Sequence, residues 1–319
     1  MAKVPIFIWL TLILAVELLL QLSPLTGIAL MMFGAPGWSV LLINGILISL
    51  IVDVWRGRLP RWVGGVPMAL YGLYLGVYLT AYAQYVLLDR QVRAANFDQS
   101  IAFDPDTQDL VADHSSASDR TGLFAPMMVG NFKLKSMYEI NRKGREQSRV
   151  TRLFAKPQCD EFRKNDFRRV TTNGLHVNWV FIRNVCGATF DEPTSRPLVT
   201  LSPKPNETRV VPWRVELQPI EITDPDGQSI RLTTGTMQLP TLIPMPVIGC
   251  TLISSTPRWQ CFAHFARTLK PIGGEDHWPT TDGRAWAAAA ALGLEPRMLR
   301  NVRRTTLSSF GEIDPSEIP

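Results

Sequence analysis

Three long apolar runs near the start of the chain limit what it can fold into more than any other feature. They occupy residues 4–22, 38–55 and 63–88, and runs of this kind can cross a bilayer as helices. A cleavable signal peptide is the alternative for the first run, but no small-x-small site closes it and more apolar sequence follows. The second run begins either at Trp38 or near Ile28, with a kink at Pro36. We predict a three-helix membrane domain over residues 1–88.

The third run carries two opposed stripes of side chains. Tyrosines recur at spacings of three and four residues, which places them on one side of a helix. This tyrosine face comprises Tyr71, Tyr74, Tyr78, Tyr82 and Tyr85. Small side chains recur on the opposite side, and this small-residue face comprises Gly65, Ala69, Gly72, Gly76 and Thr80.

Small residues spaced by four let another helix approach closely, so we predict that the third helix docks other helices. The sequence leaves open which face meets the chain's own first two helices and which face meets a partner. A quinone-like or lipid ligand at the tyrosine face is a further alternative, because buried phenols need hydrogen-bond partners.

Two polar side chains lie inside the apolar runs. Glu17 lies in the first run, where a carboxylate usually faces a helix interface or a water-filled cavity. Two interpretations of Glu17 are open: it is part of a proton or ion relay, or it forms a hydrogen bond with a neighbouring helix. We favour the hydrogen bond. Asn44 in the second run can bond across helices. Asp53 closes that run beside Arg56, so we expect these two to pair at the interface.

The charges beside the runs predict an orientation. Arg56, Arg58 and Arg61 lie between the second and third runs, Lys3 precedes the first, and residues 23–37 carry no charge. The positive-inside rule puts the N-terminus and the arginine loop in the cytoplasm. Residues 89–319 then lie outside the cytoplasm, and we expect a bacterial inner membrane with these residues in the periplasm.

The rest of the chain reads as a connector, a β-rich domain and a tail. We expect the connector over residues 89–149, the β-rich domain over 150–270 and a helical tail over 271–319. Hairpins are predicted at Asn173-Gly174, at Asp224–Gly227 and near Ser255-Thr256. Pro219 places part of one strand at a sheet edge. The overall expectation is an α+β membrane protein whose outer domain is a sandwich or barrel.

Four cysteines test this hairpin scheme, and all four lie in the predicted outer part. A hairpin centred between Ser255 and Thr256 sets Cys250 directly opposite Cys261. The hairpin at Asn173-Gly174 brings Cys159 near Cys186. We therefore predict two disulfides, Cys159–Cys186 and Cys250–Cys261, which imply an oxidising compartment. The alternative, a Cys₄ zinc site, lacks CxxC spacing.

The sequence offers little catalytic chemistry. It has no metal-binding His pair, P-loop, GxGxxG or GxSxG motif, and we predict no metal and no cofactor. A few residues around Ser136 resemble the bacterial signal peptidases, which use a Ser–Lys pair on a β domain. The proline expected after Met137 is absent and the family's later motifs are missing, so we set this resemblance aside.

These observations favour a non-enzymatic role. We expect a structural or accessory subunit of an envelope assembly that docks through its third helix and outer domain. The expected partners are other membrane subunits and the lipid bilayer, with self-association left open. The net charge of +5 is spread along the chain and does not predict nucleic-acid binding. The alternatives are an envelope hydrolase with Ser136, His264 or His277 at its centre, and an outer ligand-binding receptor.

Overall fold

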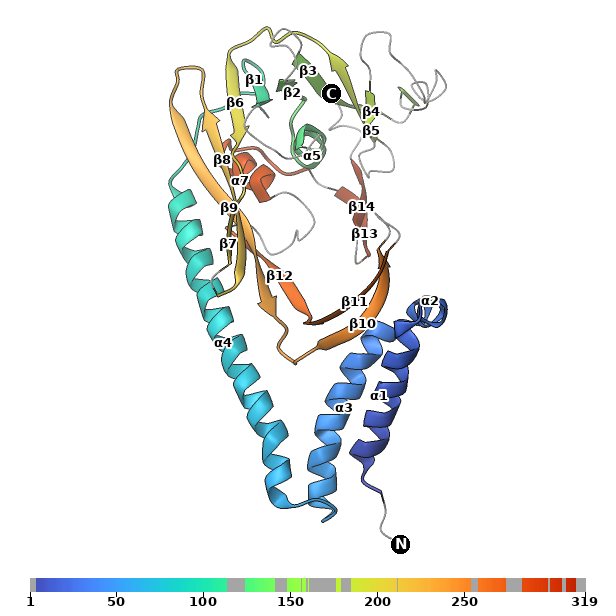
Figure 1. Ribbon diagram of the computed structural model, residues 1–319. Coiled ribbons are helices and arrows are strands. Elements are labelled where there is room, and N and C mark those ends of the chain that lie inside the picture. Colours follow the sequence, from blue (N-terminus) through green and yellow to red (C-terminus); the bar gives the residue numbers. More distant parts are fainter. Residues whose placement is uncertain are drawn as a thin grey trace. The chain divides into compact units, whose positions relative to one another are not determined.

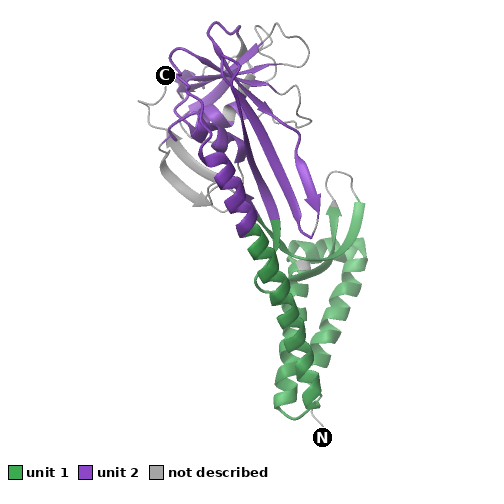
Figure 2. Cartoon of the chain, turned by 90° about the vertical axis from the view of Figure 1, so that its left-hand side faces the viewer, with its two compact units in different colours: residues 1–85, 238–269 green, residues 86–237, 270–319 purple. Residues whose placement is uncertain are grey.

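The computed structural model divides into two compact units, coloured separately in Figure 2. Unit 1 comprises residues 1–85 and 238–269, and unit 2 comprises residues 86–237 and 270–319. The structure describes residues 4–113, 124–140, 148–155, 157–158, 160, 176–178, 185–210, 212–253, 258–273, 283–297, 299–305 and 308–313.

Unit 1 is built on four helices and a hairpin (Figure 1). The helices are α1 (Ile6–Leu22), α2 (Pro24–Met32), α3 (Ala35–Trp55) and α4 (Arg61–Phe97), whose last residues belong to unit 2. Helices α3 and α4 are long and apolar enough to cross a membrane, and α1 with α2 makes a third span if this pair, bent by 116°, counts as one.

The boundaries of the second and third helices differ from the prediction. The second neither begins at Trp38 nor runs from Ile28 through a kink at Pro36. It begins at Ala35, because Gly34 adopts a left-handed φ of 73° that separates α2 from α3. The third helix extends past residue 88 to Phe97, since the polar residues there favour helix and an Asp89–Arg93 ion pair of 2.8 Å spans one turn.

The hairpin of unit 1 consists of β10 (Pro246–Ile253) and β11 (Arg258–Phe265). Its antiparallel register pairs Cys250 with Cys261, and a disulfide joins them. This predicted disulfide is confirmed. Cys186 is also disulfide-bonded, and its predicted partner, Cys159, lies outside the described residues.

Unit 2 holds most of a ten-stranded mixed sheet rather than the predicted sandwich or barrel. The strand order is β12-β9-β8-β6-β1-β2-β3-β5-β4, with β7 beside β8. Strand β1 runs parallel to both neighbours, β2 and β6, so the sheet is not an antiparallel meander. The strands are β1 (Asp109–Asp113), β2 (Ser136–Ile140), β3 (Ser148–Ala155), β4 (His176–Asn178), β5 (Val185–Asp191), β6 (Leu198–Pro203), β7 (Glu207–Val210), β8 (Arg214–Thr223), β9 (Ser229–Pro240) and β12 (Arg267–Ile272).

Two helices pack their apolar sides against strands of this sheet and form the core of unit 2. They are α5 (Phe124–Asn131) and α7 (Gly283–Ala291). Phe124, Met128 and Phe132 meet Ala285 and Ala288 together with buried residues of β1, β2, β6 and β8. The burial of these side chains provides the main favourable free energy of this layer. A smaller cluster around Val111 and Tyr138 lies apart from it.

Two of the predicted segments need correction. The connector contains β1, α5 and β2, and β1 lies inside the sheet. It was missed because β1 is short and its partner β6 is distant in the sequence. The tail contains helix α7 as predicted, but the second tail helix is instead strand β13 (Leu299–Thr305), paired with β14 (Ser308–Ile313). Pairing between the two strands overrides the helical pattern of this arginine-rich stretch.

The hairpin between β8 and β9 follows the predicted turn. Asp224 accepts the Gln228 N–H at 2.7 Å, and Gly227 has a φ of 89°. Pro219, however, lies in a strand flanked on both sides. It is tolerated because β8 faces the break between β6 and β7 at this point, where the Pro219 carbonyl accepts Lys204 N–H. The predicted Asn173-Gly174 turn lies outside the described residues.

Candidate functional site

The tyrosine face of α4 is engaged by its own unit. The Tyr71 hydroxyl donates to Asn44 Oδ1 at 2.5 Å, and the Tyr74 hydroxyl donates to the Thr241 carbonyl at 2.9 Å. The Tyr74 ring also lies against Phe265, with centroids 5.7 Å apart. The remaining tyrosines contact one another: Tyr78 with Tyr82 at 6.0 Å and Tyr82 with Tyr85 at 6.1 Å. Tyr71 and Tyr74 therefore have the partners that buried hydroxyls need.

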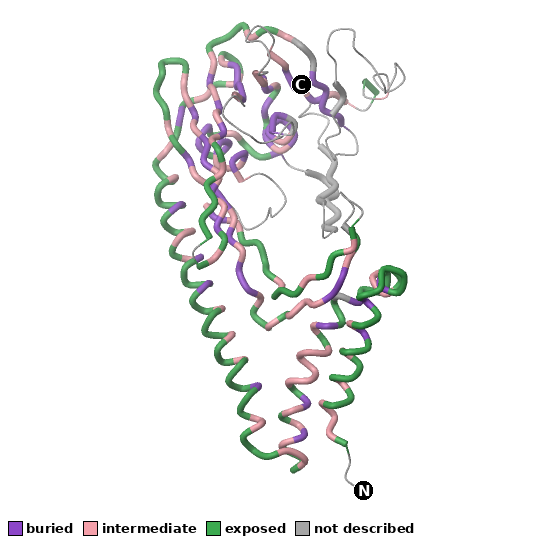
Figure 3. Tube along the Cα trace, in the orientation of Figure 1, coloured by how far each residue is buried: buried purple, intermediate pink, exposed green. Residues whose placement is uncertain are grey.

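The small-residue face of α4 is exposed along its whole length. Each of its five residues is exposed, and Figure 3 shows how little of this helix is covered. A Cβ built on Gly65, Gly72 or Gly76 would meet no atom within 4 Å. Space beside these glycines is therefore open to a neighbouring helix.

A buried polar chain joins α1 to the hairpin. Glu17 and Gln21 are 5% and 1% exposed. Gln21 Nε2 donates to Glu17 Oε1 at 2.6 Å, and Gln21 Oε1 accepts the Cys250 N–H at 2.9 Å. The indole of Trp259 donates to the Gln21 carbonyl at 3.2 Å. Glu17 therefore bonds within α1, one turn along the same helix, and not to a neighbouring helix as expected. Its Oε2 has no hydrogen-bond partner among the described residues.

Two side chains of α3 hold β10 and the segment before it. Ser39 Oγ accepts the Ile248 N–H at 2.9 Å and donates to the Pro246 carbonyl at 3.3 Å. Asn44 Nδ2 donates to the Pro244 carbonyl at 3.0 Å while its Oδ1 accepts Tyr71. Asn44 therefore links α3, α4 and the segment before β10, which exceeds the single interhelical bond expected from the sequence.

The far end of α1 is fixed by Asp53. This carboxylate is fully buried, accepts the Ile6 N–H at 2.7 Å and the Phe7 N–H at 3.3 Å, and bonds to Arg58 at 3.0 Å. It acts as a cap for α1, which has no side-chain cap of its own. Its partner is Arg58 and not Arg56 as expected, because the turn at Gly57, with a φ of 70°, directs the chain back toward Asp53.

The residues considered for catalysis do not converge in the described part of the chain. Ser136 opens β2 opposite Arg152. His264 lies on β11, its ring 5.2 Å from that of Phe262, and His277 lies outside the described residues. Among the residues that the structure describes, no cluster of His, Cys, Asp and Glu could hold a metal ion.

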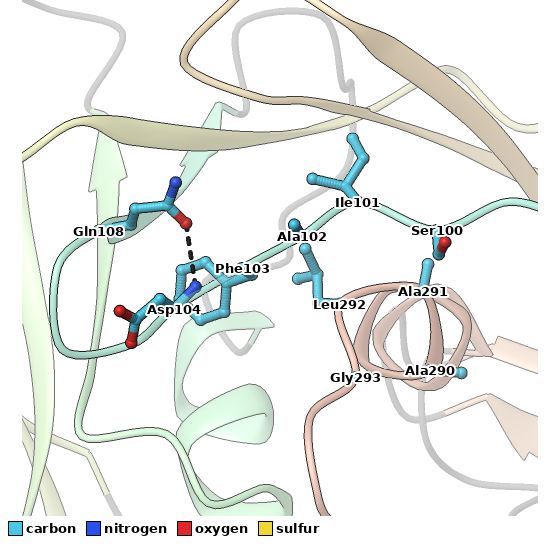
Figure 4. Close-up of a pocket in the computed structure, with 10 residues that line it drawn as sticks. All are labelled: Ser100, Ile101, Ala102, Phe103, Asp104, Gln108, Ala290, Ala291, Leu292 and Gly293. Atoms are coloured by element: carbon cyan, nitrogen blue, oxygen red, sulfur yellow. Dashed lines mark hydrogen bonds between the residues drawn. The ribbon is translucent and has the colours of Figure 1, made fainter.

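Unit 2 also has an open hollow between residues 100–104 and the end of α7 (Figure 4). The side chain of Gln108 bonds to the Asp104 N–H at 3.0 Å. The Asp104 carboxylate accepts the Asp106 N–H and the Thr107 hydroxyl, and these bonds lower its pKa. Because its own loop occupies this carboxylate, the hollow presents few polar groups to a ligand.

The site of interest therefore has two parts, both in unit 1. One is the set of polar side chains that hold β10 and the segment before it, namely Gln21, Ser39 and Asn44. The other is the small-residue face of α4. Sequence reasoning missed Gln21 and Ser39. The position of Gln21 one turn after Glu17 was a usable signal, whereas nothing local marked Ser39. Comparison with protein-family models, curated proteins and solved structures finds no match to this chain.

Proposed function

We propose that this protein is a non-enzymatic structural or accessory subunit of a membrane assembly, docking through α4 and its outer domain. The single observation that carries the proposal is that the two faces of α4 differ in their contacts. Tyr71 and Tyr74 of its tyrosine face bond within unit 1, while its small-residue face is exposed, with open space at Gly65, Gly72 and Gly76. Close helix packing at small residues is a main source of helix association in lipid.

The finer location forms part of this proposal. The chain would lie in a bacterial inner membrane with its N-terminus in the cytoplasm and residues 89–319 in the periplasm. The arginines of the α3–α4 loop and the Cys250–Cys261 disulfide support this orientation. A reporter fused after Tyr138 is expected to read as extracytoplasmic, and a cytoplasmic reading would contradict the orientation.

The docking proposal is tested by purifying the full chain in a gentle detergent and identifying the membrane chains that accompany it, including a differently tagged second copy. Gly76→Leu places a bulky side chain on the small-residue face. It is expected to lower the recovery of the partner at least about tenfold, which corresponds to about 1.4 kcal/mol.

Val77→Phe is the matched control. It adds a side-chain increment of similar size about 100° around the helix from Gly76, so recovery of the partner should not change. A chain that purifies as a lone monomer, or equal losses in both variants, would contradict docking through this face. Loss of an enzymatic activity in Ser136→Ala, with assembly intact, would favour the hydrolase instead.

A further inference from the structure

The segment that links β9 to β10, residues 241–245, reaches deep alongside the apolar helices of unit 1. Its anchors are Asn44 on α3, which binds the Pro244 carbonyl, and Tyr74 on α4, which binds the Thr241 carbonyl. In Figure 1 this link lies between α3 and the unit 1 part of α4, which diverge from their connecting loop. We call residues 241–245 the insertion loop.

The positions of these anchors give the depth of the loop. Helix α3 has 21 residues, so it is about 31 Å long, close to the thickness of a bilayer's hydrocarbon core. Asn44 lies about 14 Å along the axis from the start of α3, and Tyr74 about 20 Å from the start of α4. If α3 and α4 span a bilayer, both anchors lie near the middle of it.

Four backbone carbonyls of the loop, those of residues 241, 243, 244 and 245, are bonded within unit 1. Non-helical backbone at membrane depth requires that its polar groups be bonded within the protein. Tyr74, Asn44 and Ala266 donate to the carbonyls of Thr241, Pro244 and Met245 at 2.9, 3.0 and 2.8 Å. The Thr241 hydroxyl donates to the Ile243 carbonyl at 2.6 Å. Prolines at positions 240, 244 and 246 remove three N–H groups that would need acceptors.

The side chains of the loop point outward and are apolar. Leu242, Ile243 and Met245 are 62%, 66% and 40% exposed, and the loop carries no charge. Leu70 and Leu73 of α4 are exposed apolar side chains as well, at 49% and 70%. An apolar patch of this kind is stable only when lipid or protein covers it.

We propose that the insertion loop is a re-entrant segment whose side chains contact the acyl chains of the outer leaflet. The inference rests on the membrane-spanning role of α3 and α4. It goes beyond the docking proposal, because it makes lipid a direct ligand of residues 241–245 and assigns Asn44 and Tyr74 as the anchors of a non-helical segment. It also takes residues 241–245 out of the part proposed above to lie in the periplasm.

The test places a nitroxide label on the full-length Ile243→Cys variant in phospholipid vesicles. None of the described cysteines is free, so labelling without reductant is expected to mark the new cysteine. Collision rates are measured with oxygen, which concentrates in hydrocarbon, and with a polar nickel complex. The nickel collision rate at Ile243→Cys should be about tenfold lower than at Asp226→Cys in the β8–β9 turn, an exclusion of about 1.4 kcal/mol.

A second labelled variant, Leu73→Cys on the exposed side of α4, tests separately whether α4 lies in the bilayer. It therefore distinguishes a wrong assignment of the loop from a wrong assignment of the membrane-spanning helices. An oxygen-rich, nickel-poor signal at both Leu73→Cys and Ile243→Cys supports the loop. A lipid signal at Leu73→Cys with an aqueous signal at Ile243→Cys overturns the loop alone, and an aqueous signal at both overturns the membrane reading as well. Low collision rates with both reagents at Ile243→Cys would show a protein cover and overturn lipid as the occupant.

The anchors are tested in the same labelled chain. Asn44→Ala combined with Tyr74→Phe removes both donors to the loop carbonyls, so the nickel collision rate at Ile243→Cys should rise severalfold. Gln84→Ala, at an exposed position of α4 outside both faces, should leave it unchanged. An unchanged rate in the double variant would overturn the assignment of Asn44 and Tyr74 as anchors.

Discussion

Replacing Gln21 by Met should weaken unit 1 by much more than the similar size of the two side chains suggests. Gln21 is 1% exposed, and it satisfies both Glu17 Oε1 and the Cys250 N–H. Met keeps the volume but offers neither an amide donor nor a good acceptor. Each buried group left without a partner costs about 1–3 kcal/mol, so the two together should cost about 2–6 kcal/mol.

The assay is thermal unfolding of the full chain in detergent, together with hydrogen exchange of the β10 amides as a probe of unit 1. A loss of this size lowers Tm by about 3 °C or more for a chain of this length. Gln84→Met is the control, because Gln84 is an exposed residue of α4. A Tm unchanged by Gln21→Met, with the Cys250–Cys261 disulfide intact, would refute the view that this buried chain holds the hairpin on α1.

Three further predictions concern single residues. Asp53→Ala should destabilise unit 1 by about 3 kcal/mol, because it orphans two N–H groups of α1 and the Arg58 guanidinium; Tm measures the loss, and Asp98→Ala at an exposed site should show none. The hydrogen bond from Lys204 lowers the pKa of Glu221. The stability that this bond gives the folded chain is therefore complete above the pKa of the carboxyl in the unfolded chain, and it is lost as pH falls through the lower pKa in the folded chain. Glu221→Gln should therefore reduce Tm at pH 7, and its Tm should fall less than that of the parent on acidification to about pH 3. An equal fall in Tm would contradict this. Gly235→Ala should loosen the β8–β9 pair by about 1–3 kcal/mol, because its Cβ would press on the Glu216 carbonyl; amide exchange in β8 reports this, and Gly65→Ala, in open space, serves as the control.

Local features of the sequence were sufficient for the elements whose contacts lie close together in the chain. The apolar runs predict α1, α3 and α4, the Asp224–Gly227 turn predicts the β8–β9 hairpin, and the offset of Cys250 from Cys261 predicts their disulfide. In each case the partners are separated by a helical turn or by one short loop. Their geometry is therefore fixed by backbone periodicity and turn chemistry, which the sequence displays directly.

The mixed sheet could not be predicted in this way. Strand β1 at Asp109 pairs with β6 at Leu198 in parallel, and a parallel pair requires a long connection whose course no local pattern records. The segment around β1 consequently read as a connector. The strand β13 was missed for a related reason, since its pairing with β14 outweighs a weak local preference for helix.

On α4, the periodicity by itself established that two unlike faces exist, because a stripe of tyrosines and a stripe of small residues follow from spacing alone. Only the tertiary structure decided which face the chain uses itself. Asn44 and the insertion loop bring partners to Tyr71 and Tyr74 from 27 and 167 residues away, and they leave the small-residue face open. Contacts over such separations depend on how the whole of unit 1 folds, and the spacing of residues along one helix does not determine that fold.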